Sequence, residues 1–379
     1  MSTERHSDAD WMHRAIALAW QAGPEVRPNP RVGCVLVRDG VCVGEGFHAQ
    51  VGGPHAEVVA LRAAGDAARG ATAYVTLEPC NHHGRTPPCV DGLLAAGVTR
   101  VVCACRDPHP QARGGLDRLA AAGVEVLAGV CEAEAAALLE VFLVNTFDDR
   151  AHVRLKLAAS LDGRTAARDG SSRWITGPQA RELVHRQRAE ADAVVVGSGT
   201  ALADDPGLDV RLPAGDALAG RRPLRVVFDR RLRLPPTAAL ADASRGPCRV
   251  YTAASQLGGA AAIALQARGV EIVGLDATGD QAFALAALRD LHRRGQHAVY
   301  VEGGAALAAT LVDAGCADAL EVFLAPKLLG PGRGLFEGLA VTSIDQAALL
   351  TIDAVDRVGD DLHVRARVRR GGSDVHRDH

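Results

Sequence analysis

Apolar residues in the first part of the chain fall into short runs separated by stretches of helical periodicity. The string VGCVLVRDGVCVGEGF, residues 32–47, alternates around Asp39-Gly40, a pair that favours a two-residue hairpin turn. A first helix is predicted at 8–22, further helices at 55–65, 89–96, 111–122 and 131–147, and strands at 71–77, 98–105 and 124–130. This alternation predicts one α/β domain whose sheet is largely parallel and covered on both faces.

A second α/β domain is predicted after the charged break FDDRAH at residues 147–152. Strands are expected near 153–158, 193–197, 224–229, 248–252, 270–274, 298–302 and 319–325, followed by a hairpin at 349–368. Helices are expected at 177–190, 281–294 and 304–314. The predicted domains therefore occupy residues 1–148 and 149–370, and residues 371–379 are expected to form a disordered tail.

Composition narrows the classes of function. The chain has 379 residues, 48% hydrophobic and 23% charged, which is ordinary for globular domains. The formal net charge of -3 lacks the excess of basic residues that is typical of nucleic-acid-binding proteins. A small-molecule substrate is therefore expected. No run approaches the ~18 apolar residues of a membrane span, and the charged N-terminal stretch does not look like a signal peptide. Nine unevenly spaced cysteines favour a reducing cytoplasm over a disulfide framework.

Three metal-binding side chains lie where predicted strands end and predicted helices begin. Cys80 follows a strand, while His55 and Cys89 each begin a helix. At Cys89, the dipole of the helix N-terminus favours a thiolate. Strand ends and helix starts meet at one edge of an α/β sheet, so the three side chains can converge. A catalytic zinc ion takes three protein ligands of these types and keeps a fourth position open. We therefore predict that His55, Cys80 and Cys89 bind zinc.

Glu57 is the predicted acid and base of the same site. It lies too close in sequence to His55 to be a comfortable ligand of one ion, but it can reach a water molecule beside that ion. Zinc lowers the pKa of such a water towards ~7, so the carboxylate can take its proton and return it to a departing amine. The pattern H-x-E followed by P-C and a second cysteine is typical of zinc-dependent base deaminases. Here eight residues, in place of two, separate the cysteines, and each residue taken alone could equally be a core position.

A second candidate site lies in the second domain. Residues 300–315, YVEGGAALAATLVDAG, are typical of a strand, a Gly-Gly turn and a helix, where backbone N–H groups can approach a pyrophosphate. The signal is weak by itself, because the string is not G-x-G-x-x-G and glycines also simply end strands. Lys156 lies on the otherwise apolar strand VRLKLAAS, where a charge needs a partner, and this favours a functional role over packing.

Longer strings carry a family resemblance. They are RPNPRVGCVLV, GEGFH, VTLEPC and NHHGRTPPC in the first domain, and KLAASLDGRTA, WITGPQARELVHRQRA, TALADDPGLDVR, VEGGAALAATLVDAG and APKLLG in the second. From about residue 8 to 368 the chain resembles the bifunctional diaminohydroxyphosphoribosylaminopyrimidine deaminase and 5-amino-6-(5-phosphoribosylamino)uracil reductase family of riboflavin biosynthesis. The resemblance implies an α/β protein with a cytidine-deaminase-like three-layer domain followed by a dihydrofolate-reductase-like domain, a zinc ion in the first and NADPH in the second.

The resemblance also implies roles for individual residues. It places the zinc ligands at His55, Cys80 and Cys89 and the general acid/base at Glu57. The residues expected to line the pyrimidine and phosphate side of the first site are Asn29, His48, His82 and Arg85. The residues expected to hold the cofactor are Ala158, Trp174, Thr200, Asp204, Gly304, Ala305, Ala306, Leu307, Ala308, Ala309 and Thr310. Those expected to hold the second substrate are Ser172, Arg188, Leu208, Arg211 and Glu302.

The implied reactions are hydrolytic deamination of 2,5-diamino-6-(5-phosphoribosylamino)pyrimidin-4-one and then NADPH-dependent reduction of the ribosyl to a ribityl chain, giving 5-amino-6-(5-phosphoribitylamino)uracil. Lys156 and Asp204 would manage protons and charge at the reduced carbon. One alternative is a nucleoside or RNA-editing deaminase with an accessory domain, which the low aromatic content of 3% disfavours. Another is a non-catalytic zinc- and ligand-binding protein, whose metal site would need a fourth ligand such as His82 or His83. An exposed sheet edge favours a homo-oligomer.

Overall fold

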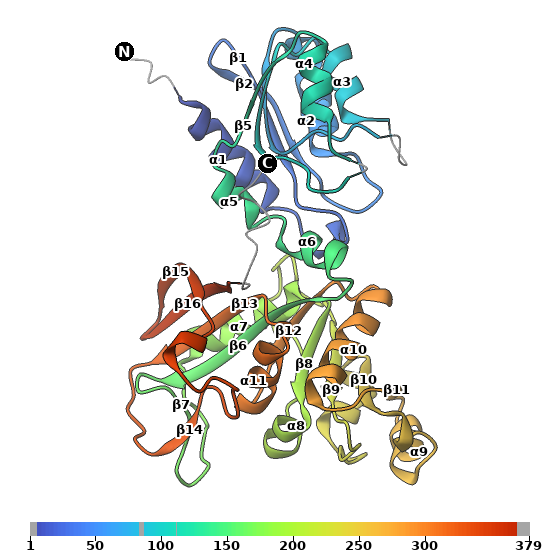
Figure 1. The fold of residues 1–379 in the computed structure, drawn as a ribbon, viewed down its shortest axis with the longest axis vertical. Helices are drawn as coiled ribbons and strands as arrows, with labels where there is room; N and C mark the ends of the chain where they lie inside the picture. Colours follow the sequence, from blue (N-terminus) through green and yellow to red (C-terminus); the bar gives the residue numbers. More distant parts are fainter. Residues whose placement is uncertain (1–5, 83–86, 111, 370–379) are drawn as a thin grey trace. The chain divides into compact units, whose positions relative to one another are not determined.

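The computed structural model describes residues 6–82, 87–110 and 112–369, and the chain divides into two compact units, Met1–Phe147 and Asp148–His379 (Figure 1). Each unit is an α/β fold built on its own main sheet. The tail predicted at 371–379 lies outside the described residues. No helix in the described part of the chain is long and apolar enough to span a membrane.

The first unit contains a five-stranded sheet with the order β2-β1-β3-β4-β5. Its strands are β1 (Gly33–Arg38), β2 (Val41–Phe47), β3 (Thr72–Leu77), β4 (Arg100–Cys105) and β5 (Glu125–Ala128). The predicted hairpin is confirmed, and its turn residues Asp39 and Gly40 both have positive φ, 54° and 76°. β1 pairs antiparallel with both β2 and β3, whereas β3, β4 and β5 are parallel. The sheet is thus mixed, and the prediction of a largely parallel sheet is right only for β3 to β5.

Helices cover both faces of this sheet, which gives the expected three layers. They are α1 (Asp8–Ala19), α2 (Ala56–Ala64), α3 (Cys89–Ala95), α4 (Gly115–Ala121), α5 (Glu132–Ala136) and α6 (Glu140–Phe147). Successive residues of β1 point to opposite faces: Val35 packs in the core under α1, and Leu36 in the core under α2, α3 and α4. The three predicted layers are therefore confirmed.

Local sequence explains how α1 starts and how closely it packs. The Ser7 hydroxyl accepts a hydrogen bond from the Asp10 N–H, and the Asp10 carboxylate accepts one from the Ser7 N–H, which forms a capping box. A Cβ on Gly33 would lie 2.0 Å from the carbonyl oxygen of Ala15, so only glycine allows this approach of α1 to β1. The helix predicted at 131–147 is in fact two helices, α5 and α6, with a break that turns Leu138 into the core.

The second unit contains a nine-stranded sheet with the order β11-β10-β9-β8-β12-β6-β13-β16-β15. Its strands are β6 (His152–Ser160), β8 (Ala193–Gly197), β9 (Leu224–Phe228), β10 (Cys248–Ala253), β11 (Glu271–Leu275), β12 (Ala298–Glu302), β13 (Ala319–Ala325), β15 (Leu350–Val358) and β16 (Asp361–Val368). The seven strands from β11 to β13 are parallel, and the terminal hairpin of β15 and β16 adds antiparallel to β13. All nine were predicted, with small differences in their ends.

Helices also cover both faces of the second sheet. They are α7 (Pro178–Glu190), α8 (Ser198–Asp204), α9 (Ala260–Gln266), α10 (Asp280–Arg293) and α11 (Ala305–Asp313). Val195 of β8 packs with residues of α10 and α11, while its neighbour Val194 packs with residues of α8 and α9 on the opposite face. Two further short strands, β7 (Arg164–Ala167) and β14 (Gly332–Gly334), pair with each other. The elements α8, α9, β7 and β14 were not predicted from the sequence.

Candidate active sites

The three predicted zinc donors converge in the first unit. His55 immediately precedes α2, Cys89 is the first residue of α3, and Cys80 lies in the loop after β3. The Nδ1 atom of His55 lies 3.2 Å from the Sγ of Cys89 and 3.6 Å from the Sγ of Cys80, and all three donor atoms lie within 4.8 Å of one another. A tetrahedral zinc ion with Zn–S bonds of about 2.3 Å and Zn–N bonds of about 2.0 Å needs separations of this size. The donor set therefore fits zinc.

Hydrogen bonds within the trio favour a thiolate. Donation from the Cys89 thiol lowers the pKa of Cys80 to about 4, and His55 and the Cys89 backbone N–H, 3.3 Å from Sγ, act in the same direction. The hydrogen bond with Cys80 in turn raises the pKa of His55. Thiols bind metal as thiolates, so this environment agrees with a metal site. Within the described ranges, this is the one group of three or more such side chains with metal-binding geometry.

Glu57 lies beside the trio on the first turn of α2, and it is 3% exposed. Burial raises the pKa of its carboxyl to about 6, and the nearby Cys80 contributes to this rise while His55 opposes it. A carboxyl with a pKa near neutrality can both accept a proton and return it. The structure thus places Glu57 where a proton shuttle for this site would have to be.

A cavity of about 550 Å³ is lined by His55, Cys80 and Glu57. This volume is typical of a site for a small molecule. Three of the predicted substrate residues, Asn29, His48 and His82, line it. The fourth, Arg85, lies outside the described residues, as does His83.

The protonation of His48 follows from its two hydrogen bonds. Its Nδ1 lies 2.9 Å from the carbonyl oxygen of Pro54, which can only accept, so Nδ1 carries the proton. Burial lowers the pKa of His48, which favours the neutral ring, and its Nε2 accepts from the Asn29 side-chain nitrogen at 2.9 Å. The Asn29 amide is thereby oriented, and its oxygen is left as an acceptor for a ligand.

A buried carboxylate that was not predicted from the sequence, Glu78, also lines the cavity. Its two oxygens accept hydrogen bonds from the backbone N–H groups of Asp107, Gly114 and Leu116 at 2.9–3.0 Å. Glu78 thereby fixes the returning loop after β4 against the loop that carries Cys80. The signal in the sequence is a charged residue directly after the buried run of β3. Three further cavity residues that were not predicted are Asp107, His109 and Phe142.

In the second unit, Lys156 lies in a partly buried group of charges. On β6 it stands opposite Glu302 of β12 and Glu321 of β13. Arg188 of α7 binds Glu302 in a bidentate pair through Nε and Nη2, the latter at 2.8 Å. Burial lowers the pKa of Lys156, although both glutamates oppose this shift. Burial alone would raise the pKa of Glu302, but Arg188 and Lys156 hold it below its ordinary value.

The predicted cofactor residues on α8 and α11 lie close together. A Cβ on Gly304 would be 3.0 Å from the hydroxyl oxygen of Thr200, so a bulkier residue would press against that side chain. Bare backbone at the start of a nine-residue helix suits the pyrophosphate of a dinucleotide. Within the predicted stretch 304–310, the side chains of Ala305, Ala308 and Ala309 are buried in the core, so contacts there would be made by the backbone.

Trp174 presents an exposed ring, with 64% of its surface accessible. The guanidinium of Arg181 lies 4.7 Å from the ring centre, and Lys327 Nζ donates to the carbonyls of Trp174 and Ile175 at 2.7 and 2.8 Å. The backbone at Trp174 is thus held in place while its ring remains accessible to a ligand. Ala158 and Ser172 are partly exposed.

The remaining predicted residues lie at or after the end of α8. Asp204 accepts a hydrogen bond from Arg173 through its backbone carbonyl, and no polar contact joins it to Lys156 among the residues described. Leu208 is 2% exposed and packs in the core, so it can meet a ligand only through its backbone. Arg211 is largely exposed and contacts His185 at 3.0 Å.

Two family models match the chain. Residues 5–105 match the cytidine and deoxycytidylate deaminase zinc-binding region, and residues 151–364 match the RibD C-terminal domain. Fold and site together therefore define an enzyme with two activities, a zinc-dependent deaminase followed by a reductase.

Similar proteins cover almost the entire chain. The riboflavin biosynthesis protein RibD of Escherichia coli is 41% identical over 365 residues, which span 94% of this chain and 98% of that protein. Among solved structures, RibD of Acinetobacter baumannii has a TM-score of 0.78 at 40% identity, and covers 96% of this chain and 99% of its own. The diaminohydroxyphosphoribosylaminopyrimidine deaminase/5-amino-6-(5-phosphoribosylamino)uracil reductase of Thermotoga maritima has a TM-score of 0.80 at 35% identity, with coverage of 96% and 99%.

The chain belongs to the RibD family, and it is a bifunctional deaminase and reductase of riboflavin biosynthesis. The predicted family, fold class and function are confirmed, and similarity over both units excludes the two alternatives. The two domains imply a zinc ion for the first unit and a nicotinamide cofactor for the second.

Proposed function

We propose that the first unit deaminates 2,5-diamino-6-(5-phosphoribosylamino)pyrimidin-4-one. A zinc ion held by His55, Cys80 and Cys89 would supply a Lewis acid that activates water. Glu57 takes a proton from the attacking water and passes it to the ring amine, which leaves as ammonia while the ring carbon gains a carbonyl oxygen. The observation that carries this proposal is the meeting of three donor atoms within 4.8 Å beside a buried glutamate in a cavity of suitable size.

The cavity wall supplies the groups that orient the pyrimidine. Neutral His48 fixes the Asn29 amide, whose oxygen accepts a hydrogen bond from an N–H group of the substrate. His82 lines the same cavity and, with Arg85, is proposed to bind the phosphate, because a guanidinium in the loop before a helix start suits that group.

For the second unit, we propose reduction of the ribosylamino group to a ribitylamino chain. NADPH would supply the hydride to the anomeric carbon. Lys156, whose lowered pKa makes it a better proton donor than an ordinary lysine, would protonate the ring oxygen as the sugar opens. Asp204 is proposed to balance charge at that carbon. Arg188, Arg211 and Glu302, with Ser172 and the backbone of Leu208, would hold the phosphorylated substrate.

One assay tests both steps together. Zinc-loaded protein is incubated with the pyrimidine substrate, and ammonia release and NADPH oxidation are followed in the same sample. We expect one ammonia to be released for each NADPH oxidised. The rate of reduction should be lower when NADH is supplied in place of NADPH. Lys156→Met should keep ammonia release and slow NADPH oxidation by at least about 100-fold. Absence of ammonia from the zinc-loaded wild type would refute the proposal for the first unit.

We also propose that the chain forms a homo-oligomer. β15 is an edge strand of the second sheet and exposes Leu350, Ile352 and Val355, at 40%, 63% and 56%. An apolar edge strand of this kind is usually covered by another chain. Light scattering that gives the mass of a single chain would contradict this.

A further inference from the structure

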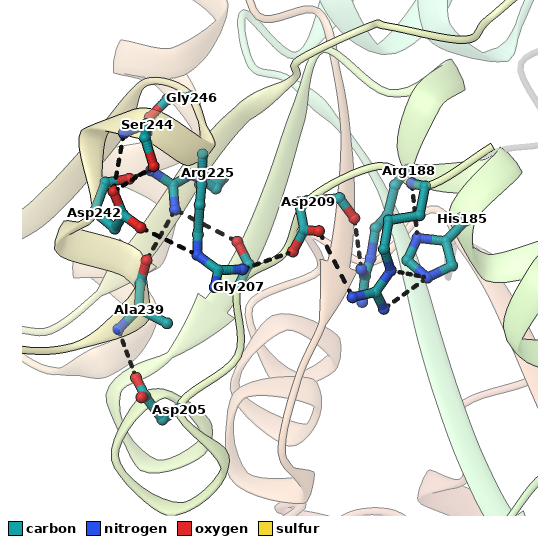
Figure 2. Close-up of polar contacts among 12 residues, drawn as sticks. His185, Arg188, Asp205, Gly207, Asp209, Arg225, Ala239, Asp242, Ser244 and Gly246 are labelled. Atoms are coloured by element: carbon teal, nitrogen blue, oxygen red, sulfur yellow. Dashed lines mark hydrogen bonds and ion pairs between the residues drawn. The ribbon is translucent and has the colours of Figure 1, made fainter. Parts of the chain in front are cut away.

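Arg225 is a buried guanidinium that no carboxylate neutralises directly. It lies on β9, it is 1% exposed, and within the described ranges no acidic side chain comes within ion-pair distance of it. Its two terminal nitrogens instead donate to four backbone carbonyls, those of Gly207 at 3.4 Å, Ala239 at 3.2 Å, Asp242 at 2.9 Å and Gly246 at 2.6 Å (Figure 2). Its Nε is buried without a hydrogen-bond partner, and burial lowers the pKa of Arg225.

Stability alone gives a weak reason for a guanidinium in this position. Moving a charged group out of water is costly, and apolar side chains of similar volume often replace buried ions without loss. Arg249 on the neighbouring strand β10 differs, because it is buried beside Glu271, Gln296 and Tyr251, with Glu271 at 2.8 Å. Through its four hydrogen bonds to carbonyls, Arg225 joins the backbones of two loop segments.

The first of these segments, residues 205–211, has a backbone that needs support. Asp205 and Leu208 are non-glycine residues with positive φ, 42° and 52°, a conformation that is unfavourable unless the surroundings fix it. The second segment, 239–246, supplies that support through further contacts. The Ala239 N–H donates to the Asp205 carboxylate at 2.8 Å, and Arg245 lies 3.4 Å from the Asp209 carboxylate.

The supported segment leads directly to the reductase site. The carbonyl of Asp209 accepts a hydrogen bond from Arg188 Nη1 at 2.9 Å, and Arg188 binds Glu302, which stands opposite Lys156. Figure 2 shows Arg225 bonded to Asp242 and Gly207 and, two residues further along the same segment, Asp209 bonded to Arg188.

We propose that Arg225 is a positioning residue of the reductase: it fixes the 205–211 segment so that Asp209 orients Arg188 and Arg211 is presented to the phosphorylated substrate. Arg225 itself does not touch the substrate. The proposal rests on the proposed function of Arg188, Arg211 and Glu302 as substrate-binding residues, and it adds how they are held.

The test compares Arg225→Met with Arg249→Met. Both changes remove a buried arginine from adjacent strands of the same sheet, but only Arg225 contacts the 205–211 segment. For Arg225→Met we expect kcat/KM for the ribosylaminouracil substrate to fall about tenfold or more, mainly through KM, because several charge-assisted hydrogen bonds are lost. Dissociation constants for NADPH and rates of ammonia release should stay at the wild-type values. Amide hydrogen exchange in 205–211 should become faster.

Two further variants make the result decisive. Arg225→Lys keeps the charge, but a lysine lacks the planar fork of donors that binds four carbonyls. Its KM should therefore lie between the values of the wild type and of Arg225→Met. If Arg225→Met does not fold, Gly207→Ala replaces it, since a Cβ there would lie 2.4 Å from the Asp209 carboxylate and 2.7 Å from Arg245. Gly207→Ala should raise the KM for the ribosylaminouracil substrate although Arg225 is still present.

An unchanged KM in Arg225→Met, or in Gly207→Ala where that replaces it, overturns the inference. So does an equal rise of KM in Arg249→Met. A wild-type protein that does not oxidise NADPH would instead refute the proposed function.

Discussion

Glu57 is a buried carboxylate beside the zinc donors, and we propose that it carries the proton in deamination. Glu57→Gln keeps the shape of the side chain but removes its ability to carry a proton. We expect ammonia release to fall by a factor of roughly 10² to 10⁴, with zinc content unchanged and with NADPH oxidation unchanged when it is assayed with the deaminated substrate. The measurements are ammonia release and metal analysis on the purified variant.

A matched control for this prediction is Glu134→Gln, the same change at an exposed position of the first unit, where the side chain is 59% accessible. It should leave ammonia release unaltered. Near-normal deamination by Glu57→Gln would remove Glu57 as the proton shuttle.

At the scale of residues, the sequence predicts best those side chains whose chemistry is unusual for their position. His55, Cys80 and Cys89 stand out because soft donors lie at the ends of elements that meet at one sheet edge. Glu78 does not stand out, because its three backbone partners belong to a loop that returns from β4, and no local pattern reveals that return. Likewise, the role of Arg225 depends on carbonyls from two distant loops.

At the scale of elements, an ion pair ties the starts of two strands in the second unit. Arg150, just before β6, donates to both carboxylate oxygens of Asp318, just before β13, at 2.8 and 2.7 Å, and the Val153 N–H donates to the same group. Burial would raise the pKa of Asp318, but the hydrogen bonds and the charge of Arg150 lower it below its ordinary value. The stabilisation is therefore complete above the unfolded-state pKa of about 3.9 and is lost as pH falls through the folded-state pKa.

Asp318→Asn tests this pairing. At neutral pH we expect the second unit to lose about 3–5 kcal/mol of unfolding free energy, because the buried Arg150 loses its facing carboxylate. The difference from the wild type should shrink as the pH falls below about 4. Denaturant unfolding at neutral and acid pH measures both; an equal difference at the two pH values would contradict the assigned role.

Elements were predictable where a strong pattern marks them. The β1–β2 hairpin follows from Asp39-Gly40 and its alternating flanks, and the buried runs of β8 and β12 were found with their ends. The strand β14 is three residues long and contains two glycines, so it forms only because β7 pairs with it. The helices α8 and α9 are only seven residues long, too short for a clear helical period.

At the scale of the whole molecule, each unit carries its own site and its own core. Removal of zinc with a chelator should therefore abolish ammonia release while NADPH oxidation, assayed with the deaminated substrate, continues. The first unit should also unfold at a lower temperature, because metal binding contributes to its stability. Calorimetry with and without chelator measures this; loss of both activities on chelation would show that the units do not act separately.

The central claim is that three protein donors hold zinc and leave one position for water. Zinc X-ray absorption spectroscopy on the wild-type protein tests it most directly. We expect two sulfur ligands at about 2.3 Å, one imidazole nitrogen at about 2.0 Å and one exchangeable oxygen. A third sulfur or a second imidazole in the coordination shell would mean a closed structural site, and would contradict deamination by this chain.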